Sequence, residues 1–213
     1  MKISYAILTH NEGEYIENLL SFLINHKQSE DEIVVVDDYS TDELTKSILD
    51  KYSSHIKLEY REFDGDHTQK NYLNSLCSGD YILQLDADEL VSSDFINMLP
   101  QLLELNNETD LFIIPRINTV EGLTQEYIQK WRWNVNEKGW VNFPDWQMRL
   151  YRNCDWVKWD GLLHSKIEGN KTHVFLPQDE KFCILHPKQL ERQVEQNDLY
   201  DKIEATGRTK YKV

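Results

Sequence analysis

The sequence has few cysteines and no long apolar run. Three cysteines, Cys77, Cys154 and Cys183, lie far apart in the 213 residues, so the chain offers neither a CxxC metal pair nor a disulfide framework. This spacing predicts reduced, structural cysteines in a cytoplasmic protein. No segment approaches the roughly 20 apolar residues of a transmembrane helix, and the N-terminus does not resemble a signal peptide. We therefore expect no transmembrane segment, which leaves peripheral contact with a membrane open.

Basic residues are scarce in the first half of the chain. Residues 1–110 hold 7 Lys and Arg against 23 Asp and Glu, whereas residues 111–213 hold 16 against 14. Because nucleic-acid binding requires clustered Lys and Arg against the phosphates, we do not expect a broad basic face. A local basic surface stays open in the second half, which contains Lys130, Arg132, Lys138, Arg149, Arg152, Lys158, Lys166 and Lys171.

The apolar residues that are present suffice for one folded α/β domain. They make up 40% of the chain, and short strand-like segments alternate with segments of helical periodicity up to residue 116. Strands are predicted at 3–8, 33–36, 56–60, 81–85 and 111–115. Helices are predicted at 14–23, from a cap at Ser40 or Thr41 to 52, at 68–76, and at 95–105 with a break or kink at Pro100. This order predicts a mostly parallel sheet with helices on both faces.

The alternation stops after residue 116. Residues 117–146 are rich in aromatic and turn-forming residues and show no clear period. Short strands are predicted at 147–152, 155–159 and 182–185, followed by an amphipathic helix at 187–203 with Pro187 in its first turn. We expect a single domain over 1–213, in which residues 1–116 and 117–213 form two halves.

Polar clusters follow three of the predicted strands. Ligands of parallel α/β sheets bind beyond the carboxyl ends of the strands, so this topology brings the clusters together. The clusters contain Thr9, Asn11 and Glu12, then Asp37 and Asp38, then Asp86 and Asp88.

Asp86 and Asp88 are separated by one residue directly after a buried strand. Two carboxylates on a tight turn can approach one hard cation, and Mg²⁺ or Mn²⁺ in such sites usually also binds substrate phosphates. A cation that bridges a diphosphate promotes its departure as a leaving group. The alternative interpretation is a solvated turn.

The other clusters are suited to a nucleoside. Asp37 or Asp38 can accept a hydrogen bond from a uracil imide or a ribose hydroxyl, or can cap the turn into the next helix. Lys70, on the helix before the Asp86 strand, contacts base or phosphate, or is solvated. The groups after the first strand either hold base and ribose or cap a helix: Thr9, Asn11 and Glu12.

Four segments in this order resemble family 2 glycosyltransferases. They are ILTHNEGEYI at 7–16, IVVVDDYSTDE at 33–43, QKNY at 69–72 and GDYILQLDADE at 79–89. A later segment, FPDWQMRLYR at 143–152, together with GLLH at 161–164, resembles the subgroup that includes bacterial lipopolysaccharide-core sugar transferases.

The resemblance implies an inverting enzyme of the GT-A fold with a nucleotide-sugar donor, commonly a UDP-sugar. Thr9 and Asp38 would bind the base, Asp86 the ribose or the metal, and Asp88 the metal. Residues 1–116 would form the nucleotide-sugar-binding half, and 117–213 the acceptor-binding half with a C-terminal helix. The sequence departs from the subgroup at Ser165, where a Glu normally follows the His.

Inversion requires a general base that takes the proton of the acceptor hydroxyl. Asp145 is our candidate, with Asp160 second, and a turn-forming Asp is the alternative for Asp145. His164 and His186 are candidates for completing the shell of a Mn²⁺ ion. Arg149 is a candidate phosphate clamp, or it stabilises its strand. The tryptophans are expected mainly to pack against the sheet, with one or two in an acceptor cleft: Trp131, Trp133, Trp140, Trp146, Trp156 and Trp159.

Other classes of protein are less consistent with the sequence. A nucleotidyltransferase would need a Gly-rich basic loop after the first strand, and a receiver domain would place its paired aspartates there. A non-catalytic nucleotide-sugar-binding module stays open. The acceptor is predicted to be a saccharide, and a hydroxymethylated DNA base modified by a phage-type transferase is the alternative.

Overall fold

The computed structural model describes residues 1–161, 165–195, 197 and 198. Its main sheet contains β1 (Ile3–Thr9), β2 (Glu32–Asp37), β3 (Lys57–Tyr60), β4 (Tyr81–Asp86), β5 (Leu111–Glu121), β6 (Val141–Arg152), β9 (His173–Phe175) and β10 (Ile184–Gln189). The strand order is β10-β5-β6-β4-β1-β2-β3, and β9 also pairs with β5. Within the described residues β6 runs antiparallel to β4 and β5, while the other pairings in this sheet are parallel.

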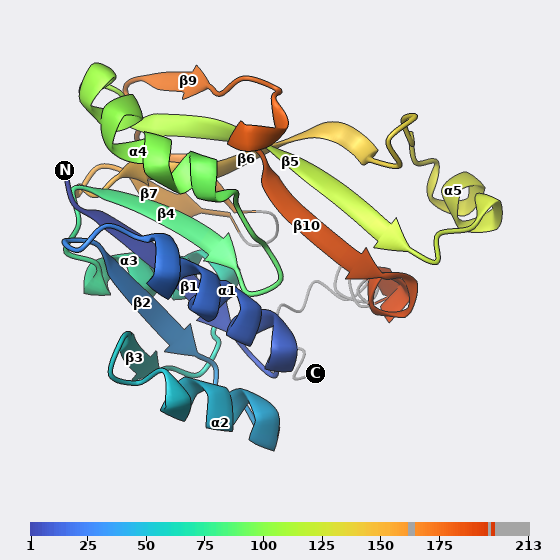
Figure 1. The fold of residues 1–213 in the computed structure, drawn as a ribbon, viewed down its shortest axis with the longest axis horizontal. Coiled ribbons are helices and arrows are strands. Elements are labelled where there is room, and N and C mark those ends of the chain that lie inside the picture. The colour runs from blue at the N-terminus through green and yellow to red at the C-terminus, as the bar shows by residue number, and fades with distance from the viewer. Residues whose placement is uncertain (162–164, 196, 199–213) are drawn as a thin grey trace.

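Helices cover both faces of the sheet, as the sequence predicts (Figure 1). One face packs against α1 (Gly13–His26), α2 (Glu43–Lys51) and α4 (Ser93–Leu105). The other packs against α3 (Asp66–Leu76) and a small hairpin of β7 (Lys158–Asp160) and β8 (Lys166–Glu168). A 3-10 turn, η1 (Glu180–Phe182), precedes β10. Residues 122–140, between β5 and β6, form an arm that projects from the sheet and carries α5 (Gln125–Trp131).

The core follows from strands that are apolar on both sides. Tyr5 and Ile7 of β1 face the first layer of helices, while Ala6 between them faces α3. Successive side chains of a strand point to opposite faces, so continuous apolar runs suit a sheet that is covered on both sides. The helix α1 meets this sheet through a stripe of four fully buried residues at helical spacing: Ile16, Leu19, Leu20 and Leu23.

Two details of the helices differ from the prediction. The N-cap of α2 is Asp42 rather than Ser40 or Thr41, because the Asp42 side chain accepts from the Thr45 backbone N–H at 2.8 Å. The helix α4 continues through Pro100 to Leu105.

The C-terminal half has more regular structure than its sequence pattern indicates. The strand β5 continues to Glu121 and β6 starts at Val141, so long-range pairing overrides the weak local signal. The predicted helix start at Pro187 is wrong, because Pro187 lies in β10 at the sheet edge, where a missing N–H is tolerated. Helical structure begins at residue 190 and is described at 190–195, 197 and 198. No helix among the described residues is long and apolar enough to cross a membrane.

The core assignment predicts the effect of truncating α1. Leu19→Ala removes a fully buried side chain and should cost about 2–5 kcal/mol of unfolding free energy, measured by urea denaturation. Leu105→Ala is the matched control, because Leu105 is 76% exposed and its truncation should change stability by no more than about 0.5 kcal/mol. Equal losses in both variants would contradict the packing described above.

Candidate active site

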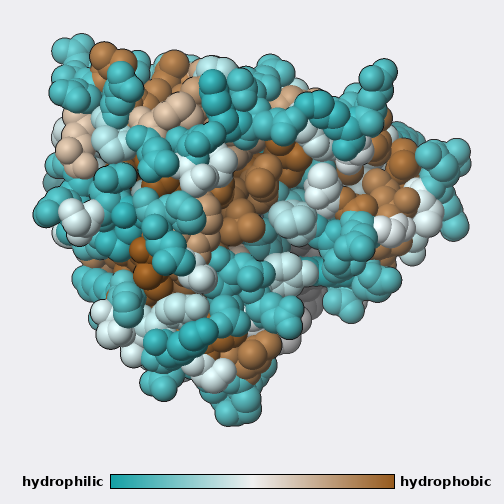
Figure 2. Space-filling view, viewed as in Figure 1, coloured by the Kyte–Doolittle hydropathy of each residue, from teal (hydrophilic) through white to brown (hydrophobic). Residues whose placement is uncertain are grey.

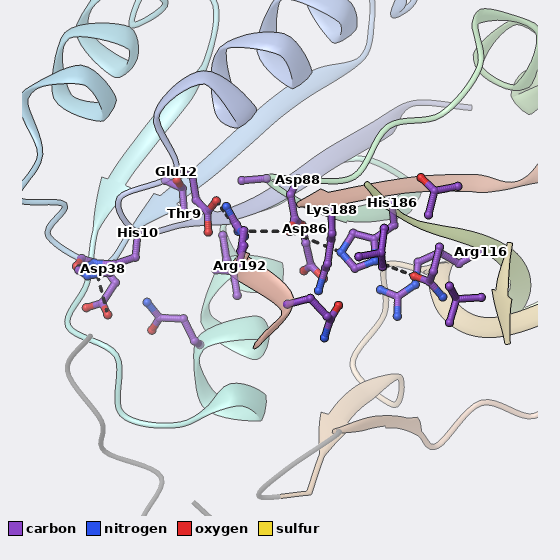
Figure 3. A pocket seen from close by; sticks show the side chains of 18 of the residues that line it. Thr9, His10, Glu12, Asp38, Asp86, Asp88, Arg116, His186, Lys188 and Arg192 are labelled. Carbon is purple, nitrogen blue, oxygen red and sulfur yellow. Dashed lines mark hydrogen bonds and ion pairs between the residues drawn. The ribbon is translucent and has the colours of Figure 1, made fainter. Parts of the chain in front are cut away.

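A cleft of about 480 Å³ lies at the carboxyl ends of β1, β2 and β4. The backbone register brings these ends together, since Thr9 pairs with Asp37 and Leu8 pairs with Asp86. Six of the predicted site residues line the cleft, and Figure 3 shows their side chains around one space: Thr9, Glu12, Asp38, Asp86, Asp88 and His186. The expectation that separate strand ends bring these residues together is met, while their role as a functional site stays a prediction.

One end of the cleft is formed by Thr9, Asp38 and Phe63. Asp38 accepts from the Phe63 backbone N–H at 2.7 Å through one carboxylate oxygen. The Thr9 hydroxyl is buried and has no hydrogen-bond partner among the described residues. Because buried polar groups in folded proteins normally have partners, this hydroxyl is suited to a hydrogen bond with a ligand.

Asn11 and Asp37 do not line the cleft and instead hold its wall. The Asn11 side-chain oxygen accepts from the backbone N–H groups of Thr41 and Asp42 at 2.7 and 3.1 Å, which fixes the start of α2. Asp37 is buried and accepts from the Ser40 backbone N–H at 3.0 Å. Both residues therefore shape the loop that carries Asp38.

Lys70 is also outside the cleft lining. Its ammonium group contacts Asp66 at 2.9 Å and Ser165 at 3.2 Å, and lies 4.3 Å from the centre of the Trp159 ring. Asp160 is exposed and accepts from the Gly161 backbone N–H. His164 lies outside the described residues.

A buried network of charges stands behind Asp86. Glu89 is fully buried and pairs with Arg116 at 2.7 Å and with Arg149 at 3.1 Å. Arg149 also binds both carboxylate oxygens of Asp86. Burial opposes ionisation of Asp86, but the Arg149 guanidinium outweighs it and holds the pKa of Asp86 well below its ordinary value. Arg149 is itself buried and does not line the cleft.

Asp145 belongs to the same network and does not line the cleft. One of its oxygens accepts from Arg116 at 2.7 and 2.9 Å and from Asn118 at 2.9 Å, and the other accepts from Gln147 at 2.7 Å. Burial opposes ionisation of Asp145, but Arg116 and these hydrogen bonds lower its pKa.

Asp88 and His186 form the part of the cleft that best suits a metal ion. Asn118 uses its NH₂ group on Asp145, so its side-chain oxygen faces the Nδ1 atom of His186 at 2.7 Å. This contact places a proton on Nδ1, which leaves Nε2 as the ring atom that a metal ion could bind. The Nε2 atom lies 3.4 Å from Asp88 Oδ2, so the ring nitrogen and the carboxylate oxygen face the same space.

This pair fits a divalent cation as a partial shell. Both side chains are only about a tenth exposed, and carboxylate with imidazole suits Mn²⁺ better than Mg²⁺. In the described part of the chain no group of three or more His, Cys, Asp and Glu side chains has the geometry of a metal site. Such ions commonly take their remaining ligands from substrate phosphates and water, so two protein ligands are compatible with binding.

Several residues of the cleft were not predicted from the sequence. Arg116 and Asn118 alternate on β5, and Lys188 follows His186 by two positions on β10, so each pair shares a face. The two-residue spacing was a usable signal, but the predicted strand ended at 115 and the predicted helix began at 187. Arg192 lies in the helical segment after β10 and contacts both Glu12 and Asp88.

Some of the tryptophans pack against the sheet and one lines the cleft, as predicted, but others do neither. Trp159 is buried against α3 and its indole N–H donates to the Tyr151 hydroxyl, while Trp133 lines the cleft. Trp131 packs against Trp133 on the arm with the two ring planes tilted by 41°, and Trp156 is 48% exposed. Figure 2 shows apolar residues exposed along the arm that carries α5.

An open carboxylate-lined cleft at this edge of a mostly parallel sheet is the arrangement of a GT-A glycosyltransferase domain. Residues 4–165 match the sequence pattern of glycosyl transferase family 2, so the chain belongs to that family. The predicted family is thereby confirmed, while the lipopolysaccharide-core subgroup stays a prediction.

Two comparisons agree with this assignment. A glycosyltransferase of Rickettsia bellii is 32% identical over 107 residues, which cover 50% of this chain and 34% of the relative. The poly(ribitol-phosphate) beta-N-acetylglucosaminyltransferase TarS of Staphylococcus aureus is 28% identical over 120 residues, which cover 54% of this chain and 21% of TarS. The chain thus spans about a third or less of the length of these relatives.

The fold is shown by a solved structure. The crystal structure of TarS residues 1–349 with UDP-GlcNAc superposes with a TM-score of 0.62 at 19% identity, covering 88% of this chain and 59% of that one. The predicted GT-A fold is confirmed by this likeness.

The buried position of Glu89 predicts a large loss of stability when its charge is removed. Glu89→Gln leaves two guanidinium groups without their shared carboxylate and should cost about 3–5 kcal/mol, measured by urea denaturation. Glu43→Gln is the control, since Glu43 forms an exposed pair with Lys46 and should change stability by less than about 1 kcal/mol. A small effect at Glu89 would mean that the network is not formed.

The lowered pKa values of Asp86 and Asp145 predict how stability depends on pH. A carboxyl group with a lowered pKa contributes stability that is present above its unfolded value, here 3.8, and is lost as the pH falls toward the folded value. Urea denaturation should therefore show a falling free energy of unfolding below about pH 4. The free energy of unfolding of Asp145→Asn should fall less steeply with decreasing pH than that of the wild type. An unchanged dependence on pH would contradict the ionisation assigned to Asp145.

Proposed function

We propose that the protein transfers a sugar from a nucleoside diphosphate donor, preferably a UDP-sugar, to an acceptor hydroxyl with inversion at the anomeric carbon. One observation carries the proposal: Asp38 and Asp88 come from separate strand ends and line the same cleft. Membership of glycosyl transferase family 2 and the likeness to TarS, whose crystal structure contains UDP-GlcNAc, support the donor class.

The nucleoside is assigned to the Thr9 end of the cleft. Asp38 keeps one oxygen for a base or ribose donor while the other is held by the Phe63 backbone, and the buried Thr9 hydroxyl supplies a further hydrogen bond. Phe63 offers an apolar edge to the base. A carboxylate at this position disfavours phosphate, whereas Lys188 and a cation bound at Asp88 would attract it, so the diphosphate is directed to that end.

The diphosphate is assigned to the end formed by Asp88, His186 and Lys188. Asp88 and His186 would hold a Mn²⁺ or Mg²⁺ ion there, and such an ion when bound supplies Lewis-acid stabilisation of the leaving diphosphate. Asn118 keeps the His186 Nε2 atom directed at Asp88, and Asp145 keeps Asn118 in place. Asp86 is proposed to face the ribose, with its charge maintained by Arg149.

We propose that Asp145 holds Arg116 and Asn118 in position and is not the general base. Both of its oxygens already accept hydrogen bonds and its pKa is lowered, which suits a group that fixes Arg116 and Asn118 better than a proton acceptor. Asp160 is the remaining candidate for the general base, as an exposed carboxylate on β7.

The acceptor is proposed to be a saccharide. The arm beside the cleft presents Trp133 to the lining, and an indole face suits the C–H side of a sugar. The basic residues that keep modified DNA as the alternative are partly engaged, because Arg149 is buried against Asp86 and Arg152 pairs with Asp110. Activity on hydroxymethylated DNA, with none on saccharides, would overturn this choice.

Removing the Asp88 charge should separate donor binding from folding. We expect Asp88→Asn to lose at least about 100-fold in transfer, because a metal ligand is lost, and to lose the metal-dependent part of UDP-sugar binding. Thermal-shift titration of a UDP-sugar panel with Mn²⁺ measures the binding, since a ligand of the native state raises the melting temperature.

The matched control is Asp50→Asn, an exposed carboxylate on α2. Both variants should retain the melting temperature of the unliganded wild type within a few degrees, but only Asp88→Asn should lose the donor-dependent shift. Full turnover by Asp88→Asn would refute the assignment of Asp88, and no response of the wild type to any sugar nucleotide would refute the function.

A further inference from the structure

Arg192 connects the segment after β10 to both sides of the cleft (Figure 3). Its Nη2 atom lies 2.7 Å from Glu12 Oε2 and 3.2 Å from Asp88 Oδ2. The guanidinium carbon lies 4.6 Å from the centre of the Tyr15 ring. One side chain thus bridges the start of α1 and the carboxylate that the proposed function assigns to the metal.

The contact with Asp88 competes with a cation. The same oxygen, Asp88 Oδ2, faces both Arg192 and the His186 Nε2 atom. A cation about 2.1 Å from that oxygen would stand no more than roughly 5 Å from the guanidinium group if Arg192 stayed in place. At this separation, and with the Asp88 side chain only about a tenth exposed, the repulsion between the two positive charges disfavours binding of the cation alone.

The two carboxylates do not hold Arg192 equally. The contact with Glu12 is shorter than the contact with Asp88 by half an ångström, and Tyr15 stacks against the same guanidinium. Glu12 and Tyr15 therefore can keep Arg192 at the edge of the cleft when Asp88 turns to a cation. From there the guanidinium has a fork of donors suited to a phosphate oxygen.

We infer that Arg192 is an internal counter-ion of Asp88 that makes the binding of cation and donor interdependent, an inference that rests on the proposed function. Without donor, Arg192 neutralises Asp88 and weakens cation binding. With donor, the diphosphate gives Arg192 a new anionic partner and Asp88 is freed for the cation. By linkage, the cation must then strengthen donor binding by the same factor.

Arg192→Met provides the first test, because it removes the charge and keeps an apolar stem over Tyr15. The probes are Mn²⁺ alone, measured by the paramagnetic resonance signal of free Mn²⁺, and UDP with saturating Mn²⁺, measured by calorimetry. We expect Mn²⁺ alone to bind several-fold more tightly than to the wild type. We expect UDP with Mn²⁺ to bind roughly tenfold more weakly, within the usual range of coupling between sites.

Glu12→Gln provides a second test of opposite sign. This change weakens the contact that draws Arg192 away from Asp88, so Mn²⁺ alone should bind more weakly than to the wild type. A merely structural role for either residue would instead weaken both ligands together and lower the melting temperature. Arg192→Lys keeps the positive charge, so its affinities for Mn²⁺ and for UDP should lie closer to those of the wild type than to those of Arg192→Met.

Glu191→Gln is the control, because Glu191 is the exposed neighbour of Arg192 and should leave both affinities unchanged. Unchanged Mn²⁺ and UDP binding by Arg192→Met would overturn the inference and leave the proposed function standing. Failure of the wild type to bind any nucleoside diphosphate in the presence of Mn²⁺ would overturn the proposed function itself. Arg192→Met with weaker binding of Mn²⁺ alone would also overturn the inference.

Discussion

A carboxylate that is wholly removed from water requires cationic partners, and the cleft is organised around one such group. Glu89 is fully buried and is compensated by Arg116 from β5 and Arg149 from β6. These two arginines can reach it because β6 runs antiparallel between β4 and β5. The same arginines then hold Asp86 and Asp145, so the carboxyl end of β4 is tied to β6 beside it and to β5 beyond.

This arrangement separates two kinds of charge in the cleft. Asp86, which lines the cleft, and Asp145 behind it are both paired with arginine, which fixes their positions and lowers their pKa values. Asp88 instead contacts His186, with which it could share a metal ion, and Arg192, which a phosphate could draw away. Exchange of partners on ligand binding is thereby expected at Asp88, while the arginine-held carboxylates keep their geometry.

The first 90 residues carried most of what could be predicted. Apolar runs ended by polar clusters placed Thr9, Asp38 and Asp88 at one edge, because parallel strand ends must meet there. The sequence could not show that Asn11 and Asp37 turn away, since capping and ligand binding use the same residue types. Arg116 and Arg192 were missed because their roles depend on long-range pairing of β5, β6 and β10, which local periodicity does not encode.

The arm that carries α5 stands apart from this framework. The helix has no buried residue, and its aromatic side chains contact one another rather than the sheet core. Its backbone amides should therefore exchange with solvent through openings that cost far less than global unfolding. Substitutions in this arm therefore should not disturb the strands that line the donor end of the cleft. The arm could thus change its acceptor preference while the donor site is kept.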